Sequence, residues 1–162
     1  MRYAQIREMD ISNGEEIGAA LFVQGCHFHC KGCFNTETWD FNGGKEFTDK
    51  TKEIIFSILN KEYIQRFSIL GGEPLCKENI KTVKSLIQEI KNKFPKIKIW
   101  LYTGYTLEEI KKDNELQEVI TLADVFIEGR FMEEFADMSY PWAGSTNQHV
   151  VRNKKMKHEP KQ

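Results

Sequence analysis

The sequence has no long hydrophobic run. Its longest apolar stretches are short, such as Ala19 to Val23, and they fall far below the ~20 residues that a membrane span needs. The first ten residues, MRYAQIREMD, also lack the charged and apolar regions of a signal peptide. We therefore expect a soluble, cytoplasmic protein.

An excess of either charge is also missing. The 162 residues include 23 basic and 24 acidic side chains, so the formal net charge is −1. This balance does not favour nucleic acid or an anionic membrane as the main partner. The length suits about one domain with a single core. We therefore expect any large substrate to be part of a partner protein.

Internal repeats and linkers are absent as well, which indicates one domain over residues 1–152. The last ten residues, 153–162, are polar, rich in lysine and without hydrophobic periodicity. Such a segment cannot bury enough apolar surface to order itself, so we expect a flexible tail.

Cysteine is scarce. The chain has four cysteines, and Cys26, Cys30 and Cys33 are crowded into eight positions. Disulfide frameworks belong mainly to small secreted chains with cysteines spread along them. The crowding therefore indicates a metal site. Cys76 stands alone, and we expect it to be a small buried hydrophobe rather than a ligand.

Strand and helix patterns alternate along the chain. The expected strands cover residues 19–23, 67–70, 97–102 and 125–127. The expected helices cover residues 48–60, 78–93, 107–112 and 115–122, with Thr48 as a candidate cap. This alternation implies parallel β/α units, and in such folds functional sites collect at the carboxyl ends of the strands.

A candidate motif follows each expected strand. These motifs are Gly25-Cys26, Gly71-Gly72-Glu73-Pro74, Thr103-Gly104-Tyr105 and Glu128-Gly129-Arg130. We expect them to meet at one edge of the sheet.

The three crowded cysteines suit an iron–sulfur cube. Spacers of three and two residues bring the thiolates together without a large loop-closure penalty. Three ligands for four irons would leave one iron open to an exogenous ligand, as in a catalytic site. A zinc site with His27 or His29 is one alternative, although zinc ribbons usually pair two-residue spacings. Disulfide chemistry of Cys30 and Cys33 is another, and it leaves Cys26 unexplained.

The cysteine spacing and the Gly71 to Pro74 turn together resemble the radical S-adenosylmethionine superfamily. Within it, the chain is similar to the family of proteins that activate anaerobic ribonucleoside-triphosphate reductases. The resemblance covers nearly the whole chain and rests on residues 10–14, 22–26, 32–35, Trp39, 71–75, 100–105, 128–129 and 144–148. Two positions depart from the family pattern: Glu128 replaces an expected aspartate, and His149 stands where arginine is frequent.

The resemblance implies an α/β fold, a partial (β/α) barrel of mostly parallel strands with outer helices. It also implies a 4Fe-4S cluster on Cys26, Cys30 and Cys33, whose open iron chelates the amino and carboxylate groups of S-adenosylmethionine. The expected cofactor contacts are Gly32, Phe34, Gly71, Gly72, Glu73, Tyr105, Arg130 and Phe131. Core packing is the alternative for the aromatic residues, and plain turns are the alternative for the glycine motifs.

The implied activity is reductive cleavage of S-adenosylmethionine to methionine and a 5′-deoxyadenosyl radical, which takes hydrogen from a glycine of the reductase. No catalytic residue beyond the cluster and S-adenosylmethionine is expected. The implied electron donor is reduced flavodoxin or a similar protein. The alternatives are an activase of the pyruvate formate-lyase type and a non-enzymatic zinc or iron–sulfur binding module. The aromatic-rich stretch 131–142 could dock a partner or pack in the core.

Overall fold

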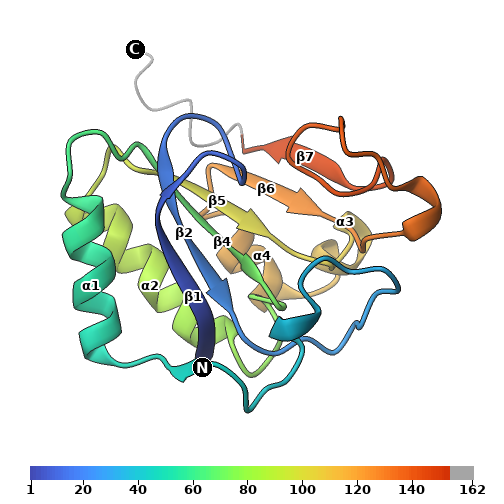
Figure 1. Cartoon of the computed structure of the whole chain (residues 1–162), viewed down its shortest axis with the longest axis horizontal. Coiled ribbons are helices and arrows are strands. Elements are labelled where there is room, and N and C mark those ends of the chain that lie inside the picture. The colour runs from blue at the N-terminus through green and yellow to red at the C-terminus, as the bar shows by residue number, and fades with distance from the viewer. Residues whose placement is uncertain (154–162) are drawn as a thin grey trace.

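The computed structural model describes residues 1–153, which fold around one sheet (Figure 1). Its strands are β1 Arg2–Asp10, β2 Gly18–Val23, β3 Lys45–Glu46, β4 Arg66–Gly71, β5 Lys98–Tyr102, β6 Val125–Glu128 and β7 His149–Arg152. They lie in the order β3-β1-β2-β4-β5-β6-β7. The four central strands, β2, β4, β5 and β6, are parallel, and the strands outside them pair antiparallel.

The sheet is therefore mixed. The four strands expected from the sequence are present, and their parallel pairing is confirmed. We expected a mostly parallel sheet, and the antiparallel strands β1, β3 and β7 were not predicted. Most side chains of these outer strands are at least partly exposed, so they lack the apolar run that marks a buried strand. The architecture is α/β, as expected.

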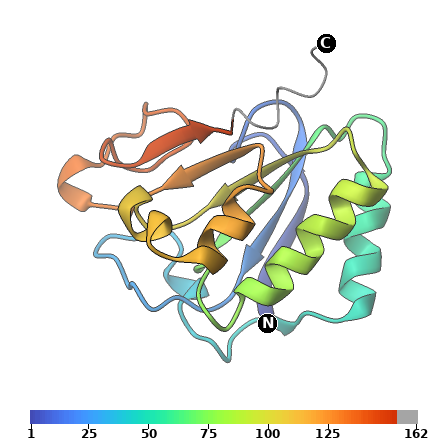
Figure 2. The same cartoon turned by 180° about the vertical axis from the view of Figure 1, so that it is seen from behind.

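The helices are α1 Asp49–Leu59, α2 Ile80–Lys93, α3 Leu107–Lys111 and α4 Asn114–Ile120, with short 3-10 turns η1 Thr36–Thr38 and η2 Glu133–Phe135. Thr48 caps α1 as expected, because its hydroxyl accepts a hydrogen bond from the Thr51 backbone N–H. Seen from opposite sides, α1, α2 and α4 cover the same face of the sheet (Figures 1 and 2).

The two faces of the sheet are buried in different ways, because successive strand residues point to opposite sides. Leu21, Ile69 and Leu101 share the main core with the helices. On the other face, Trp100 packs edge-on against Trp142, which belongs to the loop before β7. Loops rather than long helices thus cover this second face, which leaves room for a cavity.

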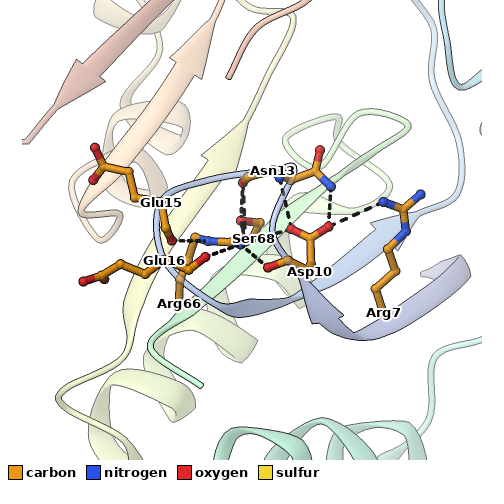
Figure 3. Close-up of polar contacts among 7 residues, drawn as sticks. All are labelled: Arg7, Asp10, Asn13, Glu15, Glu16, Arg66 and Ser68. Atoms are coloured by element: carbon orange, nitrogen blue, oxygen red, sulfur yellow. Dashed lines mark hydrogen bonds and ion pairs between the residues drawn. The ribbon is translucent and has the colours of Figure 1, made fainter. Parts of the chain in front are cut away.

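Arg66, the first residue of β4, fastens the loop between β1 and β2 to the sheet (Figure 3). Its guanidinium is fully buried and lies 3.1 Å from the carboxylate of Asp10. It also donates hydrogen bonds to the carbonyls of Asp10 at 2.6 Å and Glu15 at 2.8 Å, and to the Ser68 hydroxyl at 2.6 Å. A buried charge is tolerated when its donors are satisfied in this way.

Glycine is required where this loop crosses Arg66. A Cβ on Gly14 would lie 2.4 Å from Cδ of Arg66, and one on Gly18 would lie 2.5 Å from its carbonyl oxygen. Gly14 also has a positive φ of 150°. The Asn13-Gly14 turn is therefore shaped by the arginine beneath it.

The end of the described chain is held to the fold. The Asn153 side-chain amide donates to the carbonyls of Ile120, Thr121 and Ala123. The rest of the expected tail, 154–162, lies outside the described residues, so its flexibility stays a prediction. Within residues 1–153, no helix is long and apolar enough to cross a membrane.

Replacing Arg66 by Met is expected to lower the free energy of unfolding by about 3–5 kcal/mol, because the Asp10 carboxylate would stay buried without its cation. The matched control is Arg152→Met. Arg152 pairs at 2.6 Å with Glu15 on the surface, and such pairs contribute about 0–1 kcal/mol. Urea unfolding of both variants tests the difference. Equal losses would contradict the assigned role of Arg66.

Candidate functional site

A cavity of about 720 Å³ lies at the carboxyl ends of the parallel strands. Its size falls within the range of small-molecule sites. The motifs that follow β2, β4, β5 and β6 all contribute to it, as the sequence predicts. The cavity also extends over the helix-free face of the sheet, past Leu70, Tyr102 and Ile127, to residues 12–13 and 137–144.

The three cysteines that follow β2 all line this cavity, and each is partly exposed with a free thiol. Backbone hydrogen bonds fix the start of their loop. The Gly25 N–H donates to the Thr38 carbonyl at 2.7 Å, and the Cys26 N–H donates to the Trp39 carbonyl at 3.1 Å. The His29 ring stacks on the Trp39 ring at 4.4 Å. The η1 turn and Trp39, which follows it, thereby hold the cysteine loop in place.

The surroundings of the thiols fit metal-bound sulfur. The Asn35 N–H donates to the Cys33 sulfur at 3.3 Å. Burial raises the pKa of Cys26 and Cys30, while backbone N–H groups near each sulfur lower it in part. Donors aimed at sulfur stabilise the thiolates of iron–sulfur clusters. The donor set of this loop therefore fits a cluster with three cysteine ligands.

The histidines of the loop are engaged elsewhere. His27 lies 3.0 Å from the Glu78 carboxylate, and His29 stacks on Trp39. Neither lines the cavity. In the described part of the chain, no three Cys, His, Asp or Glu side chains stand close enough to hold one metal ion.

The turn after β4 packs directly against the cysteine loop. The Gly72 N–H donates to the Val23 carbonyl and the Glu73 N–H donates to the Gly25 carbonyl, both at 2.8 Å. A Cβ on Gly72 would lie 2.4 Å from the Gly25 carbonyl oxygen. Gly71 has a φ of +101°, which favours glycine. The two glycines therefore allow the close approach of the two motifs.

Glu73 is a buried carboxylate on the cavity wall. It accepts hydrogen bonds from the Thr103 hydroxyl and the Gly104 N–H, both at 2.7 Å, and from the Leu75 N–H at 2.9 Å. Burial raises the pKa of Glu73 to about 7, although these three donors act in the opposite direction. The charge of Arg130 also lowers this pKa but does not offset burial, so a ligand ammonium group could further stabilise the ionised form.

Arg130 presents its guanidinium to the cavity in a fixed orientation. It forms a two-pronged ion pair with Glu109, at 3.1 and 3.0 Å, and lies 4.2 Å above the Phe28 ring. Glu109 also accepts a hydrogen bond from the Thr106 N–H at the start of α3. Helix α3 therefore helps to orient the arginine.

Six of the eight expected cofactor contacts line the cavity: Phe34, Gly71, Gly72, Glu73, Arg130 and Phe131. Gly32 and Tyr105 do not line it. The Tyr105 ring packs edge-on against Phe28 at 5.0 Å and joins the main core, whereas Gly32 faces the Glu133 carboxylate. Tyr105 therefore stands behind the cavity wall.

Several residues that shape the site were not among the expected cofactor contacts, although Thr103 and Gly104 belong to one of the predicted motifs. Thr103 and Gly104 hold Glu73, but this partner lies 30 and 31 residues away from them in the sequence. Gln148 accepts from the Gly144 and Ser145 N–H groups and donates to the Gly129 carbonyl. The motif at residues 144–148 is the signal that pointed to this turn.

The remaining positions left open by the sequence have structural partners. Glu128 accepts a hydrogen bond from the Leu107 N–H and contacts the His149 ring, so this pair joins β6 to β7 outside the cavity. Cys76 is buried, as expected, and burial raises the pKa of its thiol to about 12. It does not line the cavity.

Comparison with known proteins gives a consistent result. A family model described as a 4Fe-4S single cluster domain matches residues 12–151. A protein of Vibrio cholerae named anaerobic ribonucleoside-triphosphate reductase-activating protein is 38% identical, over 94% of this chain and 98% of the relative. Proteins of the same name from Escherichia coli K12 (38% identical; 93% and 97% covered) and Enterobacteria phage T4 (37%; 94% and 95%) are similarly close.

The raised pKa of Glu73 predicts a pH dependence of stability. Between about pH 4.5 and pH 7 the folded protein keeps a proton on Glu73 that the unfolded chain has lost, so stability falls as pH rises through this window. The difference between about 7 and 4.5 corresponds to roughly 3 kcal/mol.

Urea unfolding of the cluster-free protein and of Glu73→Gln at pH 5 and pH 8 measures this effect. The wild type is expected to gain stability relative to the glutamine variant at pH 5. Every other titratable group is common to both proteins, so its contribution cancels in the difference. A pH-independent difference between the two would show that the pKa of Glu73 is not raised in the folded protein.

Proposed function

This chain belongs to the family of anaerobic ribonucleoside-triphosphate reductase-activating proteins, and we propose that it generates a glycyl radical on such a reductase. The chain carries a 4Fe-4S single cluster domain. The observation that best supports the proposal is the meeting of three cysteines with the Gly71 to Glu73 turn around one cavity.

Cys26, Cys30 and Cys33 would hold the cluster through their thiolates. When bound and reduced, the cluster supplies the electron that cleaves S-adenosylmethionine into methionine and a 5′-deoxyadenosyl radical, which takes a hydrogen atom from a reductase glycine. The chain itself must place S-adenosylmethionine beside the cysteine loop and keep water and other hydrogen donors away.

Glu73 is suited to bind the ammonium group of S-adenosylmethionine. Its carboxylate is held by Thr103 and Gly104 and lies on the cavity wall close to the cysteine loop. A bound ammonium would lower the pKa of Glu73 and keep the carboxylate ionised at neutral pH. Because Thr103 and Gly104 fix its orientation, little side-chain entropy is lost when the ligand binds.

Other residues that line the cavity offer groups for the rest of the molecule. The Phe34 and Phe131 rings lie 5.1 Å apart, and an aromatic face of this kind can stack on adenine. Arg130 can donate to a carboxylate or to the nucleoside, because its planar fork keeps free donor positions beside the Glu109 pair. The backbone near Gly32 could add polar contacts.

The reductase glycine would enter the cavity, which extends along the helix-free face of the sheet. Because long helices cover only the other face, the sheet could serve as a partial (β/α) barrel with one open side. We assign this role to one domain spanning residues 1–152. Reduced flavodoxin or a similar protein is the proposed electron donor. The names of the relatives do not favour the pyruvate formate-lyase type or a non-enzymatic module.

The cluster assignment predicts opposite results for two cysteine variants. Cys30→Ala is expected to lose the cluster and the formation of 5′-deoxyadenosine from S-adenosylmethionine, because a ligand is missing. Cys76→Ala is the matched control and should keep both, since Cys76 is buried outside the cavity. Anaerobic reconstitution, iron analysis and product assay with dithionite measure the outcome. Bound zinc without product in the wild type would support a binding module instead.

The partner assignment predicts a radical on a second protein. The reconstituted wild type, mixed with its reductase, dithionite and S-adenosylmethionine, is expected to give a glycyl radical signal in electron paramagnetic resonance. Omitting S-adenosylmethionine or using Cys30→Ala should abolish the signal. A signal that forms on pyruvate formate-lyase and not on the reductase would reassign the substrate.

A further inference from the structure

Several large apolar side chains are exposed to solvent beside the opening of the cavity. Phe34 is 61% exposed, Met132 37%, Phe135 45% and Met138 92%. Phe34 and Met138 also line the cavity itself. We call these four residues, together with Glu133 and Glu134, the rim. Grouped exposed apolar side chains are unfavourable in water and mark interaction sites.

The rim is a fixed surface. Apart from Phe34, the rim residues belong to the segment that runs through η2, next to the cysteine loop. The segment and the loop both lie beyond the carboxyl ends of the central strands (Figures 1 and 2). The Met132 N–H donates to the Ser145 hydroxyl at 3.2 Å, and the Phe135 carbonyl accepts from the Thr146 N–H at 2.9 Å. These bonds tie the segment to the turn before β7. The exposure of Phe135 therefore does not come from a loose loop tip.

The rim is also acidic, although the whole chain is nearly neutral. Residues 131–138 contain Glu133, Glu134 and Asp137 and no basic side chain. Lys31 lies 3.8 Å from Glu133, whereas no ion pair within residues 1–153 involves Glu134. The rim thus combines apolar side chains with a net negative charge, which Lys31 offsets only in part. The complementary surface is apolar and basic.

We propose that the rim binds the reductase segment that flanks the target glycine, and that this segment carries apolar and basic side chains. The inference rests on the proposed function. Phe34 and Met138 line the cavity and are also exposed to solvent, so the cavity wall continues into the rim. A glycine that enters the cavity beside them therefore brings its flanking residues onto the rim. The apolar groups supply affinity and the carboxylates select the partner.

Phe135→Ser and Glu134→Lys test the two components separately, because neither side chain lines the cavity. The matched controls are Ile54→Ser and Glu53→Lys on α1, where Ile54 is 49% exposed. Two quantities are measured for each protein. One is 5′-deoxyadenosine formation with dithionite and no reductase, and the other is the glycyl radical yield as a function of reductase concentration.

Each rim variant is expected to form 5′-deoxyadenosine at the wild-type rate but to need about tenfold more reductase for half-maximal radical yield. Added salt should raise the reductase requirement of the wild type and have less effect on Glu134→Lys. The α1 controls should match the wild type. Rim variants whose reductase dependence equals that of the controls would overturn the inference.

Two further outcomes separate this inference from the proposed function. If the wild type forms no glycyl radical on the reductase, the proposed function itself fails. If Phe135→Ser also loses 5′-deoxyadenosine formation, Glu134→Lys alone decides, because it leaves the apolar packing intact. A Glu134→Lys protein with the wild-type reductase dependence then rejects the docking role.

Discussion

The parallel pairing of β2 with β4 is the contact on which the site depends. Its register runs from Gly18 opposite Arg66 to Val23 opposite Gly71. Backbone hydrogen bonds continue beyond the strands, from Gly72 and Glu73 to the chain at Val23 and Gly25. A slip of one residue would turn every side chain of one strand to the other face and separate the cysteine loop from Glu73. At the opposite end, buried Arg66 joins the loop before β2 to β4, so the pair is fixed at both ends (Figure 3).

The empty site disfavours the ionised groups that a cluster and a ligand ammonium need. Glu73 is buried with its pKa raised, and burial also raises the pKa of the Cys26 and Cys30 thiols. Each group is therefore harder to ionise in the empty protein than in water. A bound cluster and a ligand ammonium would remove both penalties, because metal ions favour thiolates and a cation favours a carboxylate. Binding of a cluster and of a ligand ammonium would therefore stabilise the folded chain.

Much of this arrangement could be predicted because it depends on local patterns. The apolar runs located the four central strands, Thr48 marked the start of α1, and parallel strands must bring their following motifs to one edge. The outer strands were missed because β1 is stabilised by pairing with β2 and not by an apolar run of its own. The Thr103 contact with Glu73 was also missed, because it depends on the relative placement of two strand ends, which no local pattern encodes.

The overall composition does not reveal the local acidic segment that would select the partner. A net charge of −1 suggests a surface without preference, yet the carboxylates of residues 131–138 lie together beside the cavity. Electrostatic selection depends on the local field, which decays over about 8 Å at physiological salt, and not on the total charge. The short segment between β6 and β7 would therefore attract a basic chain, although the rest of the molecule carries a small net positive charge. Since the same segment supplies cavity wall and exposed rim, a partner bound to the rim would also affect access to the site.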